Sequence, residues 1–145
     1  MTHLRAELAD RCHPFCVVCA GRNADGLGVR FQTQPDGSVV ARFRCESRHQ
    51  GYRGCLHGGI VAMLLDAAMT HCLFARDVEA VTAKLTLEYK RPTSTDADVL
   101  VRAHLTEESP PLYRLEAWLV QRRQVRARAS ATFYQPDVPP AELPR

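Results

Sequence analysis

Residues 57–70 read HGGIVAMLLDAAMT, a run that opens on two glycines and carries a single carboxylate among apolar side chains. From Ile60 to Phe74 the apolar residues cover nearly every face of the helical wheel, which predicts a central buried helix over about residues 58–75. Asp66 is therefore expected to be shielded from water. An isolated buried carboxylate is costly unless it is paired or neutralised, so catalysis explains it better than a structural ion pair or backbone bond, which stays the alternative.

The two glycines favour an oxyanion hole at the start of this helix. The first backbone N–H groups of a helix have no intrahelical partner, and without a β-carbon at Gly58 and Gly59 a substrate oxygen can approach those donors closely. The aligned peptide dipoles add roughly half a positive charge at that end, which stabilises charge developing on a carbonyl oxygen. Two glycines alone are weak evidence, and only their spacing to Asp66 makes the pattern specific.

Asp66 lies about two helical turns beyond Gly58, roughly 12 Å along the axis at ~1.5 Å per residue. Because one helix cannot easily aim both groups at a single carbon, we expect a dimer in which each site takes one half from each chain. Thr70 follows Asp66 at i+4 on the same helix face. Its hydroxyl is expected either to position a water or the carboxylate, or to bond back to the carbonyl of Asp66.

The segments on both sides of the helix have the composition and alternation of β-strands. Strands without intervening helices imply an antiparallel sheet, and a helix that is apolar all round requires that sheet to curl around it, which predicts an α+β fold. The loop over residues 46–56 leads to the helix. The predicted strands are Leu27–Thr33, Ser38–Cys45, Glu79–Arg91, Ala97–Glu107, Leu112–Arg122 and Val125–Tyr134.

The chain divides into an N-terminal extension (residues 1–24), a folded domain (25–135) and a flexible Pro-rich tail (136–145). A short helix is predicted over Thr2–Asp10 in the extension. An apolar content of 46% and a charged content of 24% over 145 residues are ordinary values for one globular domain with its own core.

Charge and hydropathy exclude two classes of partner. The net charge is only +3, and the 19 basic residues are scattered, with Lys84 and Lys90 the only lysines, so no nucleic-acid face is indicated. No apolar run reaches the length of a signal peptide near the N-terminus or of a membrane span elsewhere, so we expect a cytoplasmic protein that does not bind membranes.

Three cysteines and a histidine near the N-terminus approximate metal-ligand spacing: Cys12, His13, Cys16 and Cys19. A structural zinc site usually has two well-separated pairs, and here a second pair is missing unless Cys45 or Cys55 folds nearby. A disulfide framework is improbable in an intracellular domain of this size. We therefore expect reduced thiols and no metal, with zinc as the less favoured alternative.

The motif resembles the hotdog-fold acyl-CoA thioesterases, particularly the branch that includes the phenylacetate-pathway type. The likeness consists of the H-G-G at residues 57–59, an acidic residue nine positions after His57, and a following strand that reads VTAKLTLEYKRP at 81–92. It covers roughly residues 25–135. The resemblance implies a hotdog fold, in which a long central helix is wrapped by a curved antiparallel sheet, and a thioester hydrolase that acts on acyl-CoA.

Carried over by resemblance, Asp66 is the nucleophile or general base, the Gly58 N–H polarises the thioester carbonyl, and Thr70 positions water. His57 orients the turn. Further positions implied by the resemblance are Gln50, which matches an amide residue before the histidine, and Gly59 and Thr82, which are expected to contact substrate.

The resemblance also implies a homo-oligomer, as a dimer or a dimer of dimers, without metal or cofactor, since coenzyme A is part of the substrate. Scattered arginines are suited to CoA phosphates. Two alternatives stay open: a non-catalytic acyl-CoA-binding module of the same fold, and an enoyl-thioester hydratase or dehydratase that uses His57 and Asp66. The acyl group is not specified by the sequence.

Overall fold

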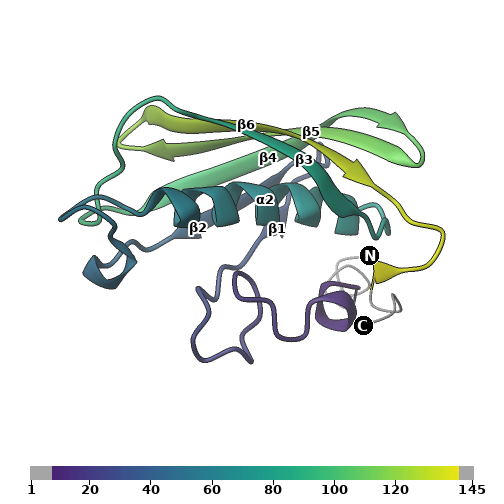
Figure 1. Ribbon diagram of the computed structural model, residues 1–145, viewed down its shortest axis with the longest axis horizontal. Helices are drawn as coiled ribbons and strands as arrows, with labels where there is room; N and C mark the ends of the chain where they lie inside the picture. Colours follow the sequence, from purple (N-terminus) through teal and green to yellow (C-terminus); the bar gives the residue numbers. More distant parts are fainter. Residues whose placement is uncertain (1–7, 141–145) are drawn as a thin grey trace.

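The computed structural model describes residues 8–140, in which one sheet of six antiparallel strands curves over one long helix, α2 (Figure 1). The helix spans Gly58–Phe74, and a short 3-10 helix, η1, spans Ser47–His49. The strands are β1 (Gln32–Thr33), β2 (Val39–Phe43), β3 (Val81–Tyr89), β4 (Val99–Ser109), β5 (Leu112–Gln121) and β6 (Gln124–Tyr134).

The strand order β1-β2-β4-β5-β6-β3 explains where the helix lies. Strands β4, β5 and β6 form a meander, with β2 on one side of it and β3 on the other. The chain leaves β2 near one edge, passes through α2 beneath the sheet, and returns as β3 at the opposite edge (Figure 1). This crossing buries the helix against the concave face and sets β3 beside it.

The core lies between α2 and the sheet because the strands alternate buried and exposed side chains. Three small residues pair across the middle of the sheet, with Ala103 opposite Ala117 and Ala117 opposite Ala129, and all three are buried. Small side chains at this position leave room for the large ones of the helix, of which Leu64 and Leu65 are fully buried.

The predicted α+β fold is confirmed, as are the central helix, the strand within Ser38–Cys45 and the four strands after the helix. The strand predicted over Leu27–Thr33 was largely wrong, because only Gln32–Thr33 pairs in the sheet. The backbone N–H groups of Leu27 and Val29 instead donate to carbonyls of the N-terminal segment, at 2.8 Å in each case. Those bonds hold the stretch outside the sheet.

The N-terminal segment packs on the side of α2 that faces away from the sheet (Figure 1). Its short helix covers residues 8–12, so it runs beyond the predicted end at Asp10, while positions 2–7 of that prediction lie outside the described residues. Leu8, Val18 and Val29 are buried, so this segment shares the domain core. The last five residues of the predicted tail also lie outside the described range, within which no helix combines the length and hydropathy needed to span a membrane.

Candidate active site

The first turn of α2 is held by His57, its N-cap residue. The Nδ1 atom of His57 accepts a hydrogen bond of 2.8 Å from the Gly59 N–H, which satisfies one of the free donors at the helix start. A β-carbon at Gly59 would lie only 3.0 Å from that nitrogen, so any larger residue there would require the His57 ring to shift by a few tenths of an ångström. The predicted orienting role of His57 agrees with this geometry.

Gly58 retains an available donor at the same turn. The N–H groups of Ile60 and Val61 donate to the carbonyl of His57, and that of Gly59 to its ring. No acceptor within residues 8–140 is found for the Gly58 N–H. Because the residue is only half-buried, this group can meet a substrate oxygen.

Tyr89, at the end of β3, was missed by the sequence analysis. Its hydroxyl donates a 2.7 Å hydrogen bond to the carbonyl of Gly58, and a β-carbon at Gly58 would make ordinary contact with it, 3.4 Å from the hydroxyl oxygen. Tyr89 therefore fixes the peptide at the start of α2. No local pattern could have found it, because the two residues are 31 positions apart.

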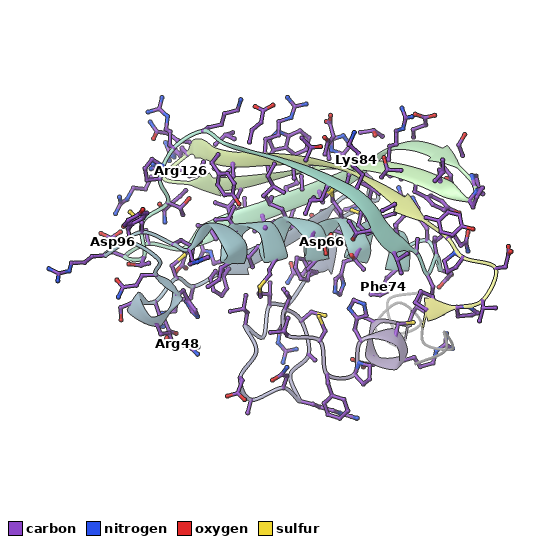
Figure 2. All side chains as sticks on the ribbon, in the orientation of Figure 1. Arg48, Asp66, Phe74, Lys84, Asp96 and Arg126 are labelled. Atoms are coloured by element: carbon purple, nitrogen blue, oxygen red, sulfur yellow. The ribbon has the colours of Figure 1, made fainter. Side chains whose placement is uncertain are left out.

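Asp66 lies midway along α2 (Figure 2). The expectation that it is shielded from water was wrong for the single chain, because its side chain is only half-buried on a face that the sheet does not cover. Its Oδ1 atom accepts a 2.7 Å hydrogen bond from the Thr82 hydroxyl of β3. The pairing of β3 with β6 is irregular between Thr82 and Lys84, and such a bulge redirects the neighbouring side chains.

The charge of Asp66 also acts on His13, in the N-terminal segment. Burial lowers the pKa of His13, and the negative charge of Asp66 opposes part of that shift. The negative charge of Asp66 therefore acts on the N-terminal segment, while its hydrogen bond is made to β3. Thr82, which the resemblance assigned to substrate, contacts the carboxylate directly and can orient it.

Of the two roles left open for Thr70, the structure has the bond back to the Asp66 carbonyl. Its hydroxyl donates a 3.0 Å hydrogen bond to the backbone carbonyl of Asp66, and its side chain is buried. This is the bond to the preceding turn that a helical threonine commonly makes. The hydroxyl proton is thus engaged within the helix and does not reach the carboxylate.

Gln50 stands beside the site rather than in it. Its Oε1 atom accepts a 3.1 Å hydrogen bond from the Gly54 N–H, which shapes the loop before α2. That loop and the helix start enclose a cavity of about 280 Å³ whose lining does not include Gln50. The catalytic role that the resemblance implied for Gln50, in aligning water, stays a prediction, and in this arrangement its amide oxygen is engaged by the loop. The cavity is lined by Gly51, Tyr52, Cys55, Leu56, His57 and Gly58.

Known proteins are similar in sequence to the part of the chain that contains the candidate site. The model of the thioesterase superfamily matches residues 53–109, from the loop before α2 to the end of β4. Acyl-coenzyme A thioesterase 13 from Homo sapiens is 28% identical over 78 residues, which cover 52% of this chain and 56% of the human protein. The chain thus spans about half the length of that curated relative.

Solved structures share the fold. A mutant of the phenylacetic acid degradation protein PaaI from Thermus thermophilus superposes with a TM-score of 0.69 at 24% identity, covering 76% of this chain and 95% of that one. A hypothetical thioesterase protein from Streptococcus pneumoniae TIGR4, solved with coenzyme A, gives 0.70 at 16% identity, covering 74% and 85%. The sheet order, the glycine-led helix and these matches agree: the chain has the hotdog fold of these structures, and over residues 53–109 its sequence is similar to the thioesterase superfamily.

Proposed function

We propose that this protein is an acyl-CoA thioesterase, which hydrolyses the thioester to a free carboxylic acid and CoA. The observation that carries the proposal is a half-exposed carboxylate, Asp66, held by Thr82 on the open face of a helix whose first turn leaves the Gly58 N–H available. The names of the curated relatives and the coenzyme A bound to a structural neighbour support acyl-CoA as the substrate class.

The reaction follows from these two groups. The thioester carbonyl oxygen accepts the Gly58 N–H, which stabilises the negative charge that develops there. Asp66 takes a proton from water, whose oxygen attacks the carbonyl carbon; the carbon–sulfur bond then breaks and the CoA thiolate takes up a proton. Direct attack by Asp66 would instead form an acyl-aspartyl anhydride that water hydrolyses, with the same products.

We further propose that each site is shared by two chains. Gly58 and Asp66 are separated by about two turns of one helix, so they cannot easily converge on one carbonyl carbon from the same chain. Strand β3 supports pairing with a second copy. It lies at the edge of the sheet, where among the described strands it pairs only with β6, and its residues Val81 through Lys84 are exposed. An unpaired strand edge is a template for another chain. A dimer of dimers is compatible with the same contact.

The primary test is a panel of acyl-CoA esters assayed for thiol release, with Asp66→Asn as the blank and light scattering to measure the oligomeric state. Release of thiol by the wild type and its loss in the variant support the proposal. Loss of an enoyl double bond without thiol release would indicate a hydratase instead. Tight acyl-CoA binding with neither reaction would indicate a binding module.

A complementation experiment tests the shared site. Gly58→Pro removes the N–H at the first helical position, where proline is tolerated, and the extended conformation of His57 (φ −60°, ψ 133°) suits a following proline. Gly58→Ala, which keeps the N–H, is the matched control. Chains with Gly58→Pro are co-expressed with chains carrying Asp66→Asn, and the mixed dimers are isolated.

In a mixed dimer with shared sites, one site carries both defects and the other carries none. We therefore expect activity of about half the wild-type value, although each variant alone is inactive. If both groups of a site came from one chain, the mixed dimer would stay inactive, which would overturn the shared-site proposal while leaving the thioesterase proposal intact.

A further inference from the structure

The N-terminal segment brings together three potential metal ligands outside the active site. The Nδ1 or Nε2 atom of His13 and the sulfur atoms of Cys16 and Cys19 all lie within 4.8 Å of one another. The Cys19 sulfur is 3.8 Å from Nδ1 of His13. Around tetrahedral zinc, bond lengths of about 2.0–2.3 Å place neighbouring ligand atoms about 3.5–3.8 Å apart, so only a small contraction would close the cluster on an ion.

The backbone around the cluster already has a turn that holds these side chains on one side. The N–H of Cys16 donates to the carbonyl of His13 at 3.3 Å, and that of Ala20 to the carbonyl of Cys16 at 3.1 Å. The N–H of Val18 points at the Cys16 sulfur at 3.4 Å. A hydrogen bond of this kind stabilises a thiolate, which is the form of cysteine that binds metal.

Cys12, the fourth member of the sequence motif, does not join the cluster. Its thiol instead lies beside the Glu79 carboxylate, and Cys12 is not among the ligand atoms that converge. The structure therefore divides the four residues of the motif into three that converge and one that does not. This division makes Cys12 a matched control, since it lies in the same segment.

We propose that His13, Cys16 and Cys19 bind one zinc ion. Two thiolates and one imidazole are a ligand set that zinc favours, and binding releases the two thiol protons, so no oxidant or reductant is needed. The cluster adjoins a cavity of about 410 Å³ that is lined by His13 and Cys19 together with Asp10. A water molecule from that cavity would be the fourth ligand. The sequence had favoured free thiols because it offers no second cysteine pair.

The ion would cross-link residues 13–19 to one another, in a segment that aromatic contacts hold against α2. The His13 ring meets Phe74 edge-on with centroids 4.9 Å apart, and Phe31 stacks on His71 at 4.5 Å, so aromatic contacts tie both ends of the segment to the last turn of the helix. Between them, residues 13–31 contain no helix or sheet strand. A loop of this length inside a compact domain usually has a function or needs a cross-link.

The test measures bound metal in protein purified without chelator or histidine tag. We expect about one zinc per chain by elemental analysis in the wild type and in Cys12→Ser, and less than about a tenth of that in Cys16→Ser and Cys19→Ser. Circular dichroism establishes that each variant is folded. Metal-free wild type, or a Cys16→Ser variant that keeps its zinc, would overturn the proposal.

Cobalt substitution provides a readout that does not depend on the variants. Wild-type protein stripped of zinc and loaded with Co²⁺ should show thiolate-to-cobalt charge-transfer absorption and the visible bands of a tetrahedral site. Octahedral bands alone, or a mass lower by two hydrogens that reveals a Cys16–Cys19 disulfide in the purified protein, would contradict it. The thiol-release assay is independent, so failure of this inference and failure of the proposed function are distinguishable.

Discussion

The two faces of α2 are equally apolar in sequence and serve different purposes. On the face toward the sheet, Leu64 and Leu65 are fully buried. On the other face, Met63 and Asp66 are only half-buried, and the carboxylate is reached by Thr82 from the sheet edge. One face therefore contributes stability and the other is free for chemistry. A helix that is apolar all round thus indicates that something besides its own sheet covers part of it.

The largest expected effect is on the buried face. Leu65→Ala should lower the free energy of unfolding by about 3 kcal/mol, because it removes a fully buried side chain and leaves a cavity. Urea denaturation measures the change, and the activity per folded molecule should stay near that of the wild type. Equal stability of the variant would mean that this face is not the core of the domain.

On the open face, Asp66→Asn should have the opposite profile. We expect thiol release to fall at least ~100-fold, or about 2.7 kcal/mol in activation free energy, since the carboxylate is the proposed base or nucleophile. The melting temperature should change little because the side chain is half-exposed. A variant that hydrolyses acyl-CoA at the wild-type rate would remove Asp66 from the mechanism.

Thr82→Val tests whether the activity of Asp66, on the open face, depends on its hydrogen bond from strand β3 at the sheet edge. Loss of the 2.7 Å hydrogen bond to Asp66 should lower the rate by about tenfold, in line with about 1.5 kcal/mol for a bond to a charged group. Thr82→Ser should recover most of the activity. The control is Thr86→Val, an exposed threonine further along β3, and an equal loss in that variant would point to the strand rather than the hydroxyl.

A variant of Thr70 tests whether its hydroxyl belongs to the buried face or acts in the reaction on the open face. Thr70→Ala removes a hydroxyl that bonds the Asp66 carbonyl, so we expect a rate within about threefold of the wild type. The steady-state rate with saturating acyl-CoA measures this. A loss as large as that of Thr82→Val would restore the water-positioning role that the sequence suggested for Thr70.

The last expected effect concerns the pH dependence of stability, at the end of the helix, and at neutral pH it is the smallest. Burial, and then the positive charge of His13, lowers the pKa of His71 to about 4 from its ordinary 6.5. Between these values the unfolded chain binds a proton that the folded chain does not, so stability falls as the pH falls through this window. His71→Phe should flatten that slope in urea titrations at several pH values. Part of the slope should remain, because burial also lowers the pKa of His49.

The site was only partly predictable from sequence. Glycines followed by an acid in an apolar helix identified Gly58 and Asp66, and the family resemblance added Thr82, whose contact with Asp66 the structure shows. Helical spacing left two roles open for Thr70, at the carboxylate or bonded to the Asp66 carbonyl, because spacing does not determine which acceptor a hydroxyl chooses. Tyr89 was missed because nothing in its local sequence marks a contact with Gly58.

Periodicity and turn residues were sufficient for the helix over Gly58–Phe74 and for most strands, because these patterns depend on neighbours a few residues apart. The tertiary structure alone revealed the contacts that assemble the site: Thr82 meets Asp66 across 16 positions, and Tyr89 meets Gly58 across 31. Both depend on the register of β3 against β6 and on the path of α2 beneath the sheet. Register and path arise from packing of the whole domain, which no local window of sequence contains.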